Sequence, residues 1–107
     1  MTTFDERERA FETKFAQDEA LRFRANARRN RFLGLWAAKK LGLVGLEAEF
    51  YARTLVMTEV DHPGCDSVFE KVSADLKNEG IAESSNEIRH LMEAFTTQAL
   101  AEIQAGR

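Results

Sequence analysis

The side chains best suited to chemistry in this chain are one cysteine and two histidines. Cys65 follows Gly64 just before an expected helix, where the helix dipole can activate a thiol. No base partner is evident for it, so we interpret Cys65 as a turn residue and not as a nucleophile. His62 and His90 are 28 residues apart and form no metal-ligand spacing with Cys65, so the sequence predicts no metal site.

The common nucleotide-binding loops are missing from the sequence. It contains neither GxxxxGK[ST] nor GxGxxG after a strand. The Asp and Glu side chains are spaced as solvated helix faces and not as a catalytic pair. These observations predict a protein that is not an enzyme and that needs no cofactor. A single cysteine cannot form an internal disulfide, which favours a reducing cytoplasm.

Length and composition predict one small globular domain. The chain has 107 residues, of which 44% are hydrophobic and 31% are charged. No apolar stretch approaches the roughly 18 residues of a membrane span, so no direct membrane insertion is expected. The acidic start, Met1 to Glu6, has no hydrophobic segment, so no secretory signal is expected either.

The net charge of −3 is distributed unevenly along the chain. Residues 21–40 contain seven basic and no acidic side chains, whereas residues 41–107 contain five basic and twelve acidic ones. The basic block can be a helix paired with acidic helices of its own fold, which we favour, or a contact for phosphate. The second interpretation predicts a nucleotide- or phosphate-responsive regulator whose contacts are Arg22, Arg24, Arg28, Arg29 and Arg31.

Helical periodicity with short loops predicts an all-α, up-down bundle of four helices. The expected helices span about residues 3–41, 46–59, 66–79 and 85–105. Gly42 and Gly80 are natural helix stops, and Ser84 to Glu87 matches a capping box. Phe50, Tyr51, Leu55 and Val56 are the apolar positions of the second helix; the side chains expected to be largely buried are Trp36, Leu55, Phe69, Leu76, Leu91 and Phe95.

The N-terminal segment has an apolar stripe on a highly charged helix. At about 100° per residue, Phe4, Phe11 and Phe15 share one narrow face, which Asp18 interrupts. Either this helix packs on its own bundle or a dimer mate, or it is a loosely packed, mobile ligand for a groove on a partner. The second interpretation divides the chain into a segment at 1–18 and a bundle at 19–107.

The stretch from Phe4 to Leu43, FDERERAFETKFAQDEALRFRANARRNRFLGLWAAKKLGL, resembles the alphaproteobacterial F-type ATP synthase inhibitor (zeta) subunit family. Its most specific part runs from Arg28 to Leu43 and contains the run Leu33 to Ala38. A looser likeness continues through Pro63 to the last helix.

The resemblance implies a four-helix bundle whose N-terminal helix inserts at a catalytic alpha/beta interface of the F1 head, near gamma. Insertion would block ATP hydrolysis and reverse rotation. The implied partners are the alpha, beta and gamma subunits and not nucleic acid. The implied location is the cytoplasm, peripherally on the membrane-bound synthase. The resemblance implies no cofactor, and it leaves open whether the chain binds nucleotide weakly. The residues expected to contact the partner are Phe4, Asp5, Arg7, Arg9, Phe11, Lys14 and Phe15.

Overall fold

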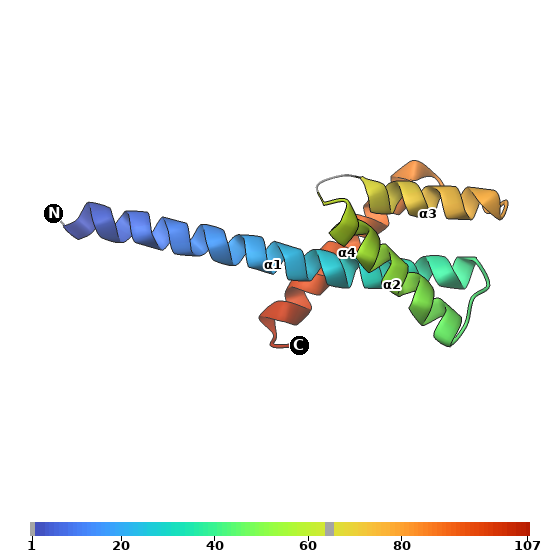
Figure 1. The fold of residues 1–107 in the computed structure, drawn as a ribbon, viewed down its shortest axis with the longest axis horizontal. Helices are drawn as coiled ribbons and strands as arrows, with labels where there is room; N and C mark the ends of the chain where they lie inside the picture. Colours follow the sequence, from blue (N-terminus) through green and yellow to red (C-terminus); the bar gives the residue numbers. More distant parts are fainter. Residues whose placement is uncertain (1, 64–65) are drawn as a thin grey trace.

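Four helices make up the described part of the chain (Figure 1). The computed structural model describes residues 2–63 and 66–107, with side chains from residue 18 onward. The helices are α1 (Thr2–Lys40), α2 (Leu46–Asp61), α3 (Ser67–Asn78) and α4 (Ser85–Gln104). No strand occurs in these two ranges. The all-α prediction is therefore confirmed, and each predicted helix is found within two residues of its expected bounds.

The helices end where the local sequence predicts. After α1, Gly42 adopts φ 79°, a left-handed conformation that costs glycine little, and the Leu43 amide donates to the Ala38 carbonyl at 2.8 Å. Gly80 ends α3 in the same way at φ 72°. At the start of α4, the Glu87 amide donates to Ser84 Oγ at 3.0 Å. This is the first half of the predicted capping box.

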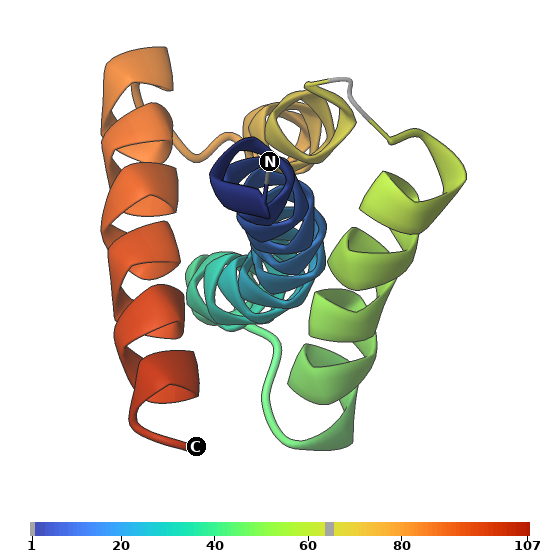
Figure 2. The same cartoon turned by 90° about the vertical axis from the view of Figure 1, so that its left-hand side faces the viewer.

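α1 is the central helix of the packed region. It contacts α2 and α4 far more extensively than any other two helices contact each other. Figure 2 views α1 nearly end on, with α2 on one side of it and α4 on the other. These two flanking helices run in opposite directions across α1, while α3 lies along it (Figures 1 and 2). The four-helix fold is thus confirmed, but its helices cross and are not aligned up and down.

A glycine permits this close crossing. A Cβ placed on Gly34 of α1 would lie 2.5 Å from Ala52 Cα and 2.9 Å from Ala52 Cβ of α2. Ala52 itself is buried, so the two backbones meet with almost no side chain between them. Small residues at a contact let helices approach closely at an angle, whereas larger side chains would hold them apart.

The core lies around α1, between the other three helices. Its fully buried members are Leu33, Ala37, Leu55, Val68, Val72, Leu76 and Ile88. Leu55 and Leu76 are buried as predicted, and Trp36, Phe69 and Phe95 are half-buried against this core. Leu91 is also half-buried. Phe50 departs from expectation: it is 68% exposed, although the nearby Ala52 is buried.

Candidate partner-binding surface

The predicted partner-contacting segment forms the first turns of α1. Its backbone belongs to the helix that begins at Thr2. The side chains of its seven predicted contact residues lie outside the described side chains, so their role stays a prediction. They are Phe4, Asp5, Arg7, Arg9, Phe11, Lys14 and Phe15. The division at residue 18 stays a prediction for the same reason.

Three of the five arginines in the basic block are paired within the fold. Arg29 of α1 donates to Glu59 of α2 at 2.7 Å, with both side chains largely buried. Arg31 contacts both carboxylate oxygens of Glu49 at 3.2 Å, in a more exposed position. Arg28 reaches Glu102 of α4 at 3.4 Å and the carbonyl of the last residue. These contacts favour the interpretation of the block as internal electrostatics.

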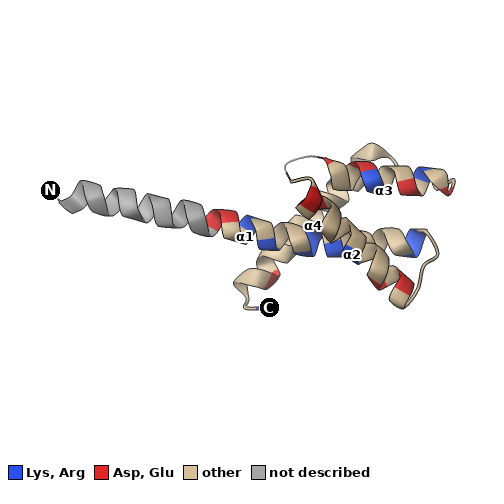
Figure 3. Cartoon of the chain, viewed as in Figure 1, with Lys and Arg blue, Asp and Glu red and all other residues tan. Residues whose placement is uncertain are grey.

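The remaining two arginines, Arg22 and Arg24, are exposed where the packed region of α1 begins. Neither has an ion pair among the described side chains. Figure 3 shows the basic residues of α1 continuing into the packed region and acidic residues on the other helices. The structure therefore does not gather the five predicted phosphate contacts into one open site.

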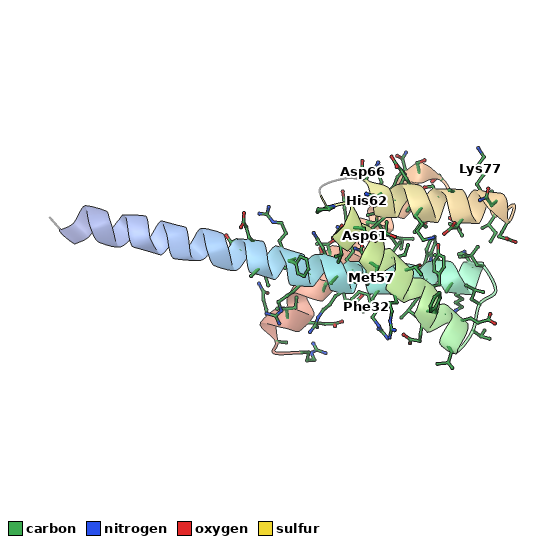
Figure 4. All side chains as sticks on the ribbon, viewed as in Figure 1. Phe32, Met57, Asp61, His62, Asp66 and Lys77 are labelled. Atoms are coloured by element: carbon green, nitrogen blue, oxygen red, sulfur yellow. The ribbon has the colours of Figure 1, made fainter. Side chains whose placement is uncertain are left out.

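Further polar contacts join the smaller helices to one another. Tyr51 of α2 donates to Asp75 of α3 at 2.7 Å, and Lys71 donates to the same carboxylate at 3.0 Å. Burial, together with the Asp75 carboxylate, raises the pKa of Tyr51 well above its usual range, so the phenol keeps its proton and its bond. Phe32 of α1, which is labelled in Figure 4, packs on Phe95 of α4 with ring centroids 5.9 Å apart. The described bundle is thus held together by its own side chains.

Exposed apolar side chains gather at two places that the sequence patterns did not predict. At the start of α2, Leu46 and Phe50 are 87% and 68% exposed beside a hollow of about 540 Å³. Near the other end of α2, Phe23 and Val60 flank a groove of about 450 Å³. The spacing of apolar residues could not predict that these side chains are exposed. A helical pattern identifies an apolar face, but it does not show whether another helix covers that face.

Metal and membrane sites do not emerge from the described residues. Their side chains form no group of three or more His, Cys, Asp or Glu with metal-binding geometry. Within the same residues, no helix has the length and hydropathy needed to cross a membrane. His62 and His90 are both exposed, and Cys65 lies outside the described residues. The described residues thus form a long helix, a bundle whose charged side chains pair with one another, and two exposed apolar patches. These features are typical of a binding protein.

Comparison with known protein families shows which kind of binding protein this is. Residues 1–102 match the family described as ATPase inhibitor subunit zeta. The chain belongs to the ATPase inhibitor subunit zeta family. A protein solved by solution NMR is 33% identical and superposes with a TM-score of 0.69, over 81% of this chain and 99% of that one. No curated protein sequence matches the chain.

Membership of the zeta family confirms the resemblance predicted from the residues between Phe4 and Leu43. It also identifies the chain as a member of a family of ATPase inhibitors, which are regulators and not enzymes. The match begins at residue 1, so it includes the predicted contact segment as well as the bundle. Which side chains contact the enzyme is a separate question that family membership leaves to experiment.

Proposed function

We propose that this chain inhibits ATP hydrolysis by the F1 head of an F-type ATP synthase, and that residues 1–18 are the inhibitory segment. In this proposal the N-terminal part of α1 enters a catalytic interface between an alpha and a beta subunit, close to gamma. A helix held there would prevent the interface from closing and would stop reverse rotation. The mechanism is steric and involves no covalent step.

The length of α1 is the observation that carries this proposal. α1 has 39 residues, whereas α2, α3 and α4 have 16, 12 and 20. At 1.5 Å per residue, α1 is about 58 Å long and the next longest helix about 30 Å. α2 and α4 cross α1 and α3 lies beside only one part of it, so the shorter helices leave part of α1 uncovered (Figure 1). The family match extends over this uncovered part, which supports assigning a function to it.

The composition of the segment suits a protein cleft. Phe4, Phe11 and Phe15 recur at helical spacing among charged residues. Burying one phenylalanine side chain contributes about 1.5–3 kcal/mol, so three can support tight binding after the cost of ordering is met. Arg7, Arg9 and Lys14 would act at the rim, where charges mainly change the association rate and its salt dependence.

The deciding experiment measures inhibition of ATP hydrolysis by purified F1. Four proteins are compared: the full chain, a chain lacking residues 1–18, a triple Phe4, Phe11 and Phe15→Ala variant, and Phe50→Ala. Phe50 is a matched control because it is an exposed phenylalanine outside the segment. We expect the truncation to abolish inhibition. The triple variant should lose about 1–3 kcal/mol of binding free energy for each phenylalanine, mainly through faster dissociation.

Circular dichroism on each variant ensures that a loss of inhibition is not a loss of folding. Phe50→Ala should inhibit as well as the full chain. Full inhibition by the truncated chain would show that the bundle, and not the N-terminal segment, blocks the enzyme.

A further inference from the structure

A groove runs between the N-terminal side of the packed region of α1 and the end of α2. Phe23, Ala27 and Asn30 line it from α1, and Val56, Val60 and Pro63 line it from α2 and the turn that follows. Its volume of about 450 Å³ is enough for one or two large side chains. Met57, three residues before Val60, is also 47% exposed and extends the apolar surface on α2 (Figure 4).

The rim of this groove is apolar and uncovered. Phe23 is 65% exposed and Val60 is 48% exposed. Single exposed apolar residues are ordinary on protein surfaces, but two that face one groove resemble the anchors of an interface. The carboxylate of Glu59, which also lines the groove, is neutralised by Arg29 at 2.7 Å. The groove therefore favours an uncharged apolar side chain.

The wall of the groove also contains a polar group that lacks a partner. Asn30 is 1% exposed, and its Nδ2 has no hydrogen bond among the described atoms. Arg29 Nε donates to Asn30 Oδ1 at 3.1 Å, which orients the amide and leaves Nδ2 as the unused donor. A buried donor without an acceptor is costly. A carbonyl oxygen that a ligand brings into the groove beside Asn30 would remove that cost.

The position of the groove indicates which ligand this is. Phe23 is five residues after Asp18, which is about 8 Å along the same helix, and α1 has no break between them. A partner that holds residues 1–18 therefore ends within about 8 Å of the groove along the helix axis. The other exposed apolar group, at Leu46 and Phe50, lies on α2 and has no member on α1. It has no such continuity.

From these observations we infer that the α1–α2 groove is a second contact for the same F1 head, on the bundle itself. The inference rests on the proposed function and adds a residue set to it. In the complex, an aliphatic or aromatic side chain of an alpha or beta subunit sits between Phe23 and Val60. A backbone carbonyl beside that side chain accepts a hydrogen bond from Asn30 Nδ2. The groove thereby anchors the bundle at the mouth of the cleft.

The test compares Phe23→Ala and Val60→Asn with Phe50→Ala in the full chain. Phe23 and Phe50 are the same residue type with nearly equal exposure, 65% and 68%, so the two alanine variants lose the same side chain from similar surroundings. Binding to purified F1 is followed by its dissociation constant and dissociation rate, with folding checked by circular dichroism. We expect Phe23→Ala and Val60→Asn each to weaken binding by about tenfold, and Phe50→Ala to leave it unchanged.

Equal binding by Phe23→Ala, Val60→Asn and Phe50→Ala would overturn the groove contact. If the chain lacking residues 1–18 still loses its inhibition in that case, the proposed function survives alone. If the truncated chain inhibits fully, the role proposed for residues 1–18 fails, and the groove contact is then decided by the Phe23→Ala and Val60→Asn variants alone. Sedimentation analysis of the free chain tests whether a second copy of the chain occupies the groove instead. A dimer that the Phe23→Ala substitution dissociates would show that it does, and would overturn the inference.

Discussion

Gly34 has more influence on this architecture than its size suggests. It lies inside α1, six residues before the helix ends, where glycine is normally unfavourable by about 1 kcal/mol relative to alanine. The cost is offset because its missing Cβ lets α1 and α2 meet at Ala52. A Leu55 methyl also lies 3.2 Å from the position a Cβ would take, so a side chain would meet both backbone and core atoms.

We predict that Gly34→Ala destabilises the fold by about 1–3 kcal/mol, because a Cβ placed 2.5 Å from Ala52 Cα must push the two helices apart. Urea unfolding followed by circular dichroism measures the change. Helix propensity alone predicts the opposite sign, so a variant as stable as the parent or more stable would refute the close crossing.

Exposure separates residues of the same type in this chain. Phe23 and Phe50 are more than half exposed, while Phe69 and Phe95 are partly buried against the core. The composition of the chain does not distinguish them. Their functions differ because exposed aromatic side chains can contribute to binding, whereas buried ones contribute to folding.

At the scale of the element, α1 both supplies part of the core and carries the basic block. Leu33 and Ala37 contribute to the core, while Arg28, Arg29 and Arg31 reach sideways to the helices that flank it. The excess of basic charge on α1 and of acidic charge on the other helices thus becomes attraction within one fold. This arrangement accounts for the charge asymmetry without an external anion.

The ion pairs of α1 should differ in strength according to their burial. A double-mutant cycle on Arg29 and Glu59, using Met and Gln, should give a coupling free energy of about 1–2 kcal/mol. The side chains of this pair are 14% and 24% exposed, and its N–O distance is 2.7 Å. The matched cycle on Arg31 and Glu49, which are 51% and 53% exposed, should give less than about 0.5 kcal/mol and should fade with added salt. Equal couplings in the two cycles would contradict the role assigned to burial.

At the scale of the whole molecule, one helix joins two regions with different tasks. The core cluster is made by residues between Leu33 and Ile88, and α4, which crosses α1, contributes Ile88 to it. The predicted inhibitory segment lies at the other end of the same helix. A continuous helix can transmit the position of the bundle to the segment without an intervening hinge, which suits a protein that acts by occupying space.

The chain lacking residues 1–18 should fold on its own, with a free energy of unfolding within about 1 kcal/mol of the full chain. The reason is that the core cluster begins at Leu33, and an isolated charged helix adds little stability in water. Thermal and urea unfolding of the two chains make the comparison. Loss of cooperative unfolding in the shorter chain would mean that the N-terminal segment belongs to the bundle.

The amino-acid sequence by itself determined the helices and the family. Glycines at 42 and 80, the Ser84 cap and the apolar spacing are local signals, and they located four helices within two residues. The residues between Phe4 and Leu43 are specific enough to identify the zeta family from their order alone. Local backbone preferences and short motifs act over a few residues, so a linear chain reveals them.

Only the tertiary structure decided how these helices cross and which side chains stay uncovered. Gly34 reads in the sequence as a weak point of a helix, and it becomes a crossing contact only when Ala52 is brought against it. In the sequence, Arg29 is one of five similar arginines, whereas in the fold it lies 2.7 Å from Glu59. Phe50 looks like a core residue, and Phe23 becomes a candidate anchor only beside Val60. Each of these facts depends on residues far apart in the chain, because burial and pairing are set by the neighbour that packing supplies.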